Sequence, residues 1–154
     1  MLELQTETDI DAPVERVWHV LMDFAAYPEW NPFIRSVQGK PDVGSRLEVE
    51  LGASGTRPMR FRPTVKVVVP NQEFRWLGHL GIRGLFDGEH IFELTPLNAG
   101  STRFVQRERF RGIFLPFLAR RLEQDVRRGF EEMNRALRER ASRPPQNAVP
   151  TGKA

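Results

Sequence analysis

The chain has 154 residues, a formal net charge of +3 and no cysteine. A chain of this length is expected to form one domain with a substantial core. The lack of cysteine excludes disulfides, a thiolate nucleophile and a cysteine-based zinc site. Because no apolar run approaches the roughly 20 residues that span a bilayer and no secretory signal is recognisable, we expect a soluble cytoplasmic protein.

The charges are distributed unevenly along the chain. Acidic residues dominate the first 30 positions, whereas arginines dominate the segment after residue 100. We expect these two regions to face each other across the fold. Nucleic-acid binding is disfavoured, because no basic stretch is interleaved with aromatics or matches a recognition module.

The chain begins with a strand and a helix. Residues 2–10 place apolar or threonine side chains on one side and acidic or amide side chains on the other, which is typical of a strand with one dry face. Behind Pro13, residues 14–22 carry apolar side chains at helical spacing. This order predicts a sheet that starts at the first residues and a helix packed against it.

A short helical turn follows the first helix. Pro28 and Pro32 prevent a long continuation, so residues 24–31 are expected to form a separate turn that displays Tyr27 and Trp30. Trp30 then lies where the helices meet the sheet, a position suited to the wall or lid of a cavity.

The middle of the chain alternates in hydrophobicity between short polar turns, a pattern typical of β-hairpins. We expect strands over residues 46–51, 59–69, 73–80, 89–95 and 102–111, and residues 33–37 could form a further short strand. With the first strand this predicts six or seven strands, all antiparallel because their connections are short.

One loop of the predicted sheet carries apolar side chains. Gly81, Gly84 and Gly88 bracket Leu85 and Phe86. The two apolar residues could cover the mouth of a pocket or close a small satellite of the core. Both interpretations stay open.

A long helix is predicted over residues 114–141, about 40 Å in length at 1.5 Å per residue. Its apolar stripe consists of Phe114, Phe117, Leu118, Leu122, Val126, Phe130, Met133 and Leu137. Only a strongly curved sheet could cover such a helix. Residues 142–154 are rich in proline and poor in apolar side chains, so we expect a disordered tail there.

The opposite face of this helix is rich in arginine. Arg120, Arg121, Arg127 and Arg128 could contact anionic lipid or a partner protein. Acidic residues at helical spacing are close enough to neutralise them. Membrane contact is therefore the less favoured interpretation.

Three short motifs give this order of elements a family resemblance. They are Pro-x-x-x-Val-Trp at 13–18, Asp-Phe-x-x-Tyr-Pro-x-Trp-Asn-Pro at 23–32 and Gly-Glu-His-x-Phe-x-Leu at 88–94. The chain resembles the START-related lipid-transfer, polyketide cyclase and dehydratase superfamily, often called SRPBCC. The resemblance implies an α+β helix-grip fold over residues 1–141, in which a curved antiparallel sheet wraps around the C-terminal helix and leaves a hydrophobic tunnel.

The predicted function is binding of a small hydrophobic ligand, such as a lipid, a fatty acyl chain or a polycyclic compound, by a carrier or sensor. The alternation of the predicted strands points a set of aromatic side chains toward the helix, where they could line a ligand cavity. The alternative is that these side chains simply fill the core. The candidate ligand-binding residues are Trp30, Phe61, Phe74, Trp76, Phe92, Phe104, Gln106, Phe110, Val126, Gly129, Phe130 and Met133.

Gly129 is included because a glycine inside a helix costs about 1 kcal/mol relative to alanine and requires a spatial reason. Room for a ligand is one such reason. Close packing of the helix on Trp18 or Trp30 is another.

An enzymatic alternative depends on polar residues in the same strand phase. His90, Gln106 and Glu108 point inward with the aromatics, and a buried glutamate must either pair or acquire a raised pKa. His90 and Glu108 could serve as acid and base in a cyclase or dehydratase, or form a structural hydrogen-bonded pair.

A third alternative is a protein-interaction module that uses the outer face of the sheet.

His19 and His79 are isolated histidines without metal-ligand spacing, so no metal is predicted. No nucleotide-binding motif or other sign of a cofactor is present. No feature of the sequence indicates an oligomeric state.

Overall fold

The computed structural model describes residues 1–144, which form two sheets and a long helix. The strands are β1 (Leu2–Ile10), β2 (Ile34–Gln38), β3 (Glu48–Leu51), β4 (Met59–Phe61), β5 (Thr64–Val69), β6 (Glu73–His79), β7 (Asp87–Asn98) and β8 (Ser101–Arg111). The helices are α1 (Val14–Met22), the short 3₁₀ turn η1 (Phe24–Ala26), α2 (Tyr27–Trp30) and α3 (Leu115–Ser142).

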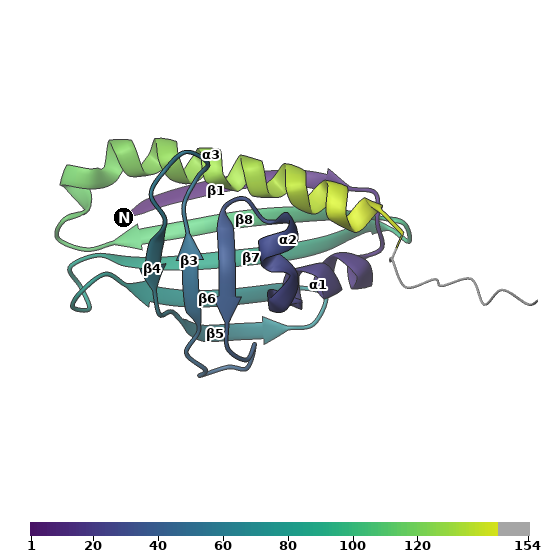
Figure 1. Ribbon diagram of the computed structural model, residues 1–154, viewed down its shortest axis with the longest axis horizontal. Helices are drawn as coiled ribbons and strands as arrows, with labels where there is room; N and C mark the ends of the chain where they lie inside the picture. Colours follow the sequence, from purple (N-terminus) through teal and green to yellow (C-terminus); the bar gives the residue numbers. More distant parts are fainter. Residues whose placement is uncertain (145–154) are drawn as a thin grey trace, which may run out of the picture.

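The two sheets enclose the core together with α3 (Figure 1). The large sheet has the antiparallel order β1-β8-β7-β6-β5, and the small sheet has the order β2-β3-β4. The small sheet runs across the inner side of the large one, while α1 and α2 sit at the end where α3 finishes. This arrangement confirms the predicted α+β helix-grip class.

The number of strands differs from the prediction of six or seven because Pro63 interrupts the expected strand at 59–69. Proline has no N–H to donate to a ladder, so pairing stops and the chain crosses from β4 in the small sheet to β5 in the large sheet. The Pro63 carbonyl accepts instead from the Leu47 N–H at 2.9 Å. The result is eight strands in two sheets that meet at this corner.

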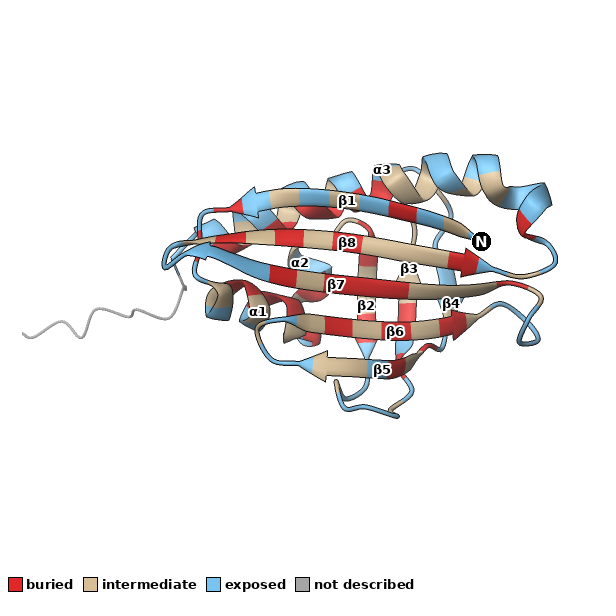
Figure 2. Cartoon of the chain, turned by 180° about the vertical axis from the view of Figure 1, so that it is seen from behind, coloured by how far each residue is buried: buried red, intermediate tan, exposed pale blue. Residues whose placement is uncertain are grey.

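Acidic and basic regions face each other, as predicted. Antiparallel pairing of β1 with β8 brings Glu3 within 3.1 Å of Arg109 and Asp9 within 2.9 Å of Arg103. These pairs lie on the outer face of the large sheet, where Figure 2 shows intermediate and exposed residues alternating with buried ones. Exposed ion pairs contribute only about 0–1 kcal/mol each to folding stability. These pairs therefore favour the correct register of the strands but add little to stability.

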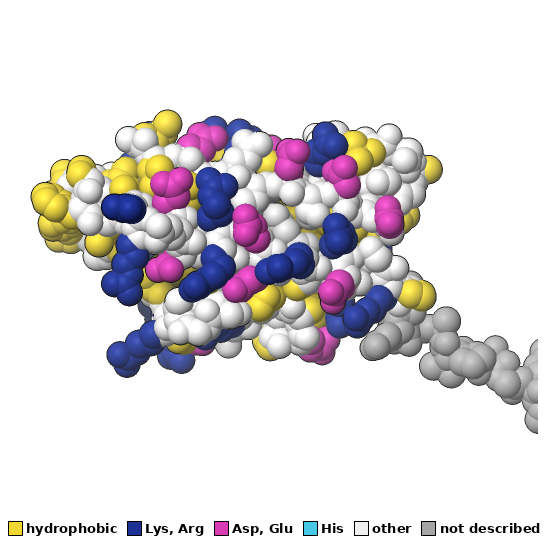
Figure 3. Space-filling view, turned by 90° about the horizontal axis from the view of Figure 1, so that it is seen from above, with side chains coloured by type: hydrophobic (Ala, Val, Ile, Leu, Met, Phe, Trp, Pro, Cys, Tyr) yellow, Lys and Arg dark blue, Asp and Glu magenta, His cyan; other side chains and the backbone are white. Residues whose placement is uncertain are grey.

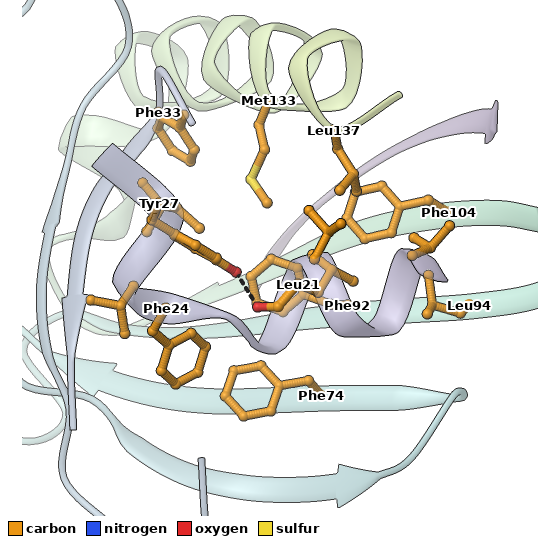
Figure 4. Packing of buried hydrophobic residues seen from close by; sticks show 14 of the residues in the cluster. Leu21, Phe24, Tyr27, Phe33, Phe74, Phe92, Leu94, Phe104, Met133 and Leu137 are labelled. Atoms are coloured by element: carbon orange, nitrogen blue, oxygen red, sulfur yellow. Dashed lines mark hydrogen bonds between the residues drawn. The ribbon is translucent and has the colours of Figure 1, made fainter. Parts of the chain in front are cut away.

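The helix followed by an aromatic turn places Tyr27 inside the core (Figure 4). Its hydroxyl donates to the carbonyl of Leu21 at 2.6 Å, which ties α2 to the end of α1. Burial raises the pKa of Tyr27 above its ordinary value, so the hydroxyl stays a donor. Trp30 is only half-buried and packs at the edge of this core.

Gly129 is explained by close packing, with a different partner from the two tryptophans considered. A Cβ atom at this position would lie 2.3 Å from the ring of Phe33. Phe33 therefore lies against the bare backbone of α3, with its ring edge-on to Phe130 at a centroid distance of 5.7 Å. The glycine seats an aromatic side chain and does not itself leave room for a ligand.

The first turn of α3 departs from the predicted apolar stripe. Leu115 is buried, but Phe114, Phe117 and Leu118 are exposed because this turn extends beyond the edge of the sheet. At the other end the helix includes Ser142, the first residue of the predicted disordered tail, and residues 145–154 of that tail lie outside the described residues. No helix within residues 1–144 is long and apolar enough to cross a membrane.

Candidate functional site

A cavity of about 260 Å³ lies between the small sheet, strands β6 to β8 and the first half of α3. Its wall is mostly apolar, with phenylalanine rings from two strands and two loops and aliphatic side chains from the helix. The main apolar contributors are Phe33, Leu51, Phe61, Phe86, Phe110, Leu122 and Val126. His90 and Glu108 supply polar atoms to the wall, and Leu80, Leu118, Arg121 and Asp125 complete it near the start of α3.

Two strand glycines allow side chains of the cavity wall to pack directly against the sheet backbone. Gly78 in β6 and Gly88 in β7 lie directly opposite each other in the ladder. A Cβ on Gly78 would lie 2.9 Å from the Phe61 ring, and a Cβ on Gly88 would lie 2.8 Å from Oε1 of Glu108. Both positions must therefore lack a side chain for Phe61 and Glu108 to occupy the cavity wall.

A buried hydrogen-bond chain connects the large sheet to α3 through Gln106. The Gln106 amide nitrogen donates to the Phe130 carbonyl at 3.3 Å and to Oδ1 of Asn134 at 2.7 Å. The Asn134 amide nitrogen in turn donates to the Thr6 hydroxyl at 3.1 Å. Because the Phe130 carbonyl can only accept, the amide of Gln106 has one orientation, with its oxygen toward His90.

The Gln106 oxygen determines the protonation of His90. Nε2 of His90 lies 3.0 Å from Oε1 of Gln106, so this ring nitrogen must carry the proton and donate it. Burial lowers the pKa of His90 to about 3, against a smaller opposing effect of the Gln106 hydrogen bond. The ring lies between Phe92 and Phe130, with centroid distances of 4.0 and 4.9 Å, which keeps it away from water.

Glu108 lies directly opposite His90 in the β7–β8 ladder. Its Oε2 is 3.2 Å from Nδ1 of His90, the ring nitrogen left with a lone pair. Burial, and secondarily the charge of Glu89, raises the pKa of Glu108 well above its ordinary value of 4.5. A neutral imidazole beside a protonated carboxyl is the state that both shifts favour, although the same two atoms could hold an ion pair in water.

This arrangement presents one neutral acid to an apolar cavity. The Glu108 side chain is 12% exposed, compared with 1% for His90, so the carboxyl is the more accessible of the two groups. At hydrogen-bonding distance its proton can be donated to Nδ1 of His90 or to an acceptor on a bound molecule. The site can therefore polarise an oxygen atom in a dry environment.

The structure brings together part of the predicted site. Phe61, Phe110 and Val126 line the cavity with His90 and Glu108. The remaining candidates lie outside its wall, in the packed core or at its edge. They are Trp30, Phe74, Trp76, Phe92, Phe104, Gln106, Gly129, Phe130 and Met133.

Sequence reasoning missed Phe33, Leu122 and the two strand glycines of the wall. A glycine within a predicted strand is a signal of close approach, and Gly78 gave that signal, whereas Gly88 was assigned to the loop before the strand predicted over residues 89–95. Phe86 satisfies both interpretations of its loop, since it lines the cavity and also packs in a small cluster with Phe110. Within residues 1–144, no group of three or more His, Cys, Asp or Glu residues is placed to hold a metal ion.

Comparison with known families identifies the architecture. The family described as "Polyketide cyclase / dehydrase and lipid transport" matches residues 1–138, almost the whole described chain. The chain belongs to this family. No curated protein matches it closely enough to count as a relative.

Solved structures with the same fold include an aromatase/cyclase and a START superfamily protein. The Zhui aromatase/cyclase from Streptomyces sp. R1128 is 19% identical with a TM-score of 0.74, over 92% of this chain and 94% of that one. A START superfamily protein from Mycobacterium smegmatis is 22% identical with a TM-score of 0.72, over 90% and 96% of the two chains. At these identities the likeness establishes the fold that the family shares.

The raised pKa of Glu108 predicts how replacement by glutamine changes stability. Unfolded chains release this proton near pH 4.5, whereas the folded protein retains it to higher pH, so the free energy of unfolding falls as the pH rises above that value. Glutamine has no proton to lose and can still donate to His90. We predict that Glu108→Gln raises Tm at about pH 8 and that the gain shrinks toward pH 4.

Thermal unfolding followed by circular dichroism across this pH range measures the effect. His90 has a lowered pKa and loses stability as the pH falls below 6.5, but it does so in both proteins, so the difference between them isolates Glu108. Glu93→Gln is the matched control, because Glu93 pairs with Arg107 on the outer face and should give no gain. A lower Tm for Glu108→Gln than for the wild type at high pH would contradict the assignment.

Proposed function

We propose that the protein binds a small, uncharged hydrophobic molecule in the cavity between the sheets and α3, as a carrier or sensor. The observation that carries the proposal is an apolar enclosure whose inner wall holds one protonated carboxyl, that of Glu108. Ligand sites typically combine apolar walls with few polar anchors. The family, which includes lipid transport in its description, supports the same class of function.

The cavity limits the size and chemistry of the ligand. At about 260 Å³ it lies just below the roughly 300–1,000 Å³ of most ligand pockets, so it suits a compact molecule or one end of a longer one. Glu108 acts as a donor in its neutral form, which favours a ligand with a carbonyl, ether or hydroxyl oxygen. A carboxylate ligand would introduce a second acid into an apolar space and is disfavoured.

Binding of 2-acetylnaphthalene, measured by isothermal titration calorimetry, tests this proposal. We predict binding that Val126→Phe weakens at least about tenfold, because the larger side chain fills the cavity. The isosteric probe 2-ethylnaphthalene should bind about two- to tenfold more weakly to the wild type, because it lacks the oxygen that accepts from Glu108.

Val43→Phe is the matched control, because it makes the same substitution at an exposed loop position away from the cavity. It should leave the affinity unchanged. Equal affinities of the wild type and Val126→Phe, or no binding of either probe, would overturn the proposal.

A second candidate function is dehydration of a β-hydroxy ketone. The 3.2 Å contact between Glu108 and His90 favours it, because the neutral imidazole orients a carboxylic acid that faces the cavity. Glu108 would protonate the departing hydroxyl, which leaves as water, and the resulting carboxylate would take the α-proton and regenerate the acid. General acid–base catalysis of this kind contributes about 10²–10⁴-fold.

Conversion of 4-hydroxy-4-phenylbutan-2-one to its enone, followed by absorbance, tests this candidate. We predict that Glu108→Gln lowers the rate at least about 10²-fold while retaining affinity for 2-acetylnaphthalene, whereas Glu93→Gln leaves the rate unchanged. A wild-type rate equal to that in buffer, or an undiminished rate for Glu108→Gln, would exclude this chemistry for the pair.

The third interpretation, an interaction module that uses the outer sheet face, stays a prediction. Charged groups on that face pair with one another, as Arg75 does with Glu73 and Glu89, which leaves the face balanced in charge. A cytoplasmic location likewise stays a prediction.

A further inference from the structure

An exposed apolar surface surrounds the mouth of the cavity. We call it the mouth patch and define it as Leu80, Ile82, Ile113, Phe114, Phe117 and Leu118. Phe117 is 85% exposed, Ile82 74% and Ile113 66%, values that are unusual for side chains of this size. Figure 3 shows hydrophobic side chains gathered at the end of the molecule where α3 begins.

The mouth patch combines three segments of the chain into one surface. The Ile113 N–H donates to the Gly84 carbonyl at 3.3 Å, and the Phe114 N–H donates to the Leu85 carbonyl at 3.2 Å. These bonds hold the loop between β6 and β7 against the loop that leads into α3. Backbone bonding therefore fixes the apolar side chains of both loops at the same end of the fold.

Positive charges outnumber negative ones around the mouth patch, where Asp87 accepts from the Gly84 N–H and lies near Arg83. Residues 80–86 and 111–122 contain Arg83, Arg111, Arg120 and Arg121 and no acidic residue. Arg121 approaches Asp125 at 3.8 Å, but both side chains are largely exposed and the pair is weak. The arginines in the middle of α3 approach acidic residues at similar distances of 3.7 and 3.8 Å, so the positive excess at this end comes mostly from Arg111 and Arg120.

The mouth patch is continuous with the cavity. Leu80 and Leu118 belong to both, since each contributes to the cavity wall and is also exposed. A molecule that leaves an apolar phase at the patch would therefore enter the cavity without crossing water. This continuity distinguishes the patch from an apolar surface placed elsewhere on the fold.

We propose that the mouth patch docks on the surface of an anionic lipid bilayer and that the cavity exchanges its ligand there. Apolar side chains flanked by arginine are the pattern that inserts at a lipid interface, and each arginine near an anionic surface adds to the attraction. The exchange step depends on the proposed ligand binding, whereas docking does not.

Co-flotation of the full chain with vesicles tests the docking. We predict that the protein floats at low salt with phosphatidylcholine vesicles containing a quarter phosphatidylglycerol, and that pure phosphatidylcholine or high salt releases it. Phe117→Ser combined with Ile82→Ser should lower the vesicle-bound to free ratio at least about tenfold, and so should Arg111→Gln combined with Arg120→Gln.

Matched controls separate docking from folding and from ligand binding. Val43→Ser removes an exposed apolar side chain elsewhere, and Arg135→Gln removes an arginine from the exposed face near the other end of α3, so both should float as the wild type does. Val126→Phe should also float normally while losing 2-acetylnaphthalene, which distinguishes a failure of docking from a failure of ligand binding.

Three results would overturn the proposal. The first is absence of the wild type from anionic vesicles at low salt. The second is equal flotation of the wild type and the patch variants. The third is a dimer in light scattering that Phe117→Ser abolishes, without any vesicle binding, which would assign the patch to a second copy of the chain.

Discussion

The buried amide of Gln106 is the interaction on which both the fold and the site depend. It joins β8 to the long helix through the Phe130 carbonyl and Asn134, and its oxygen fixes the proton of His90 on Nε2. A buried amide of this kind is costly unless each of its polar atoms is satisfied, and here both are. The Gln106 side chain thus both binds the helix and leaves the unprotonated Nδ1 of His90 facing Glu108.

The architecture could be predicted from sequence because strand alternation and helical periodicity are local signals. The inward direction of His90, Gln106 and Glu108 followed from the strand phase alone, and the ladder between β7 and β8 places His90 opposite Glu108. The crossing at Pro63 was not foreseen, since a proline can end a strand or lie at its edge and only tertiary packing decides between the two.

The cavity wall was harder to predict than the fold. Every inward side chain of a curved sheet faces the same helix, so alternation cannot tell Phe61, which lines the cavity, from Phe74, which fills the core. Phe61 packs against the backbone of Gly78, and Glu108 against that of Gly88, contacts that only the tertiary structure reveals. Helices α1 and α2 close the opposite end of the fold, which leaves the end near the start of α3 for the mouth.

His90 is neutral with its proton on Nε2, which makes Glu108 the acid of the cavity. Long-range ¹H–¹⁵N NMR of histidine-labelled protein measures this directly. We predict a protonated Nε2 and an unprotonated Nδ1 for His90, unchanged on acidification until the pH approaches about 3. A proton on Nδ1, or a charged His90 ring near neutral pH, would contradict it.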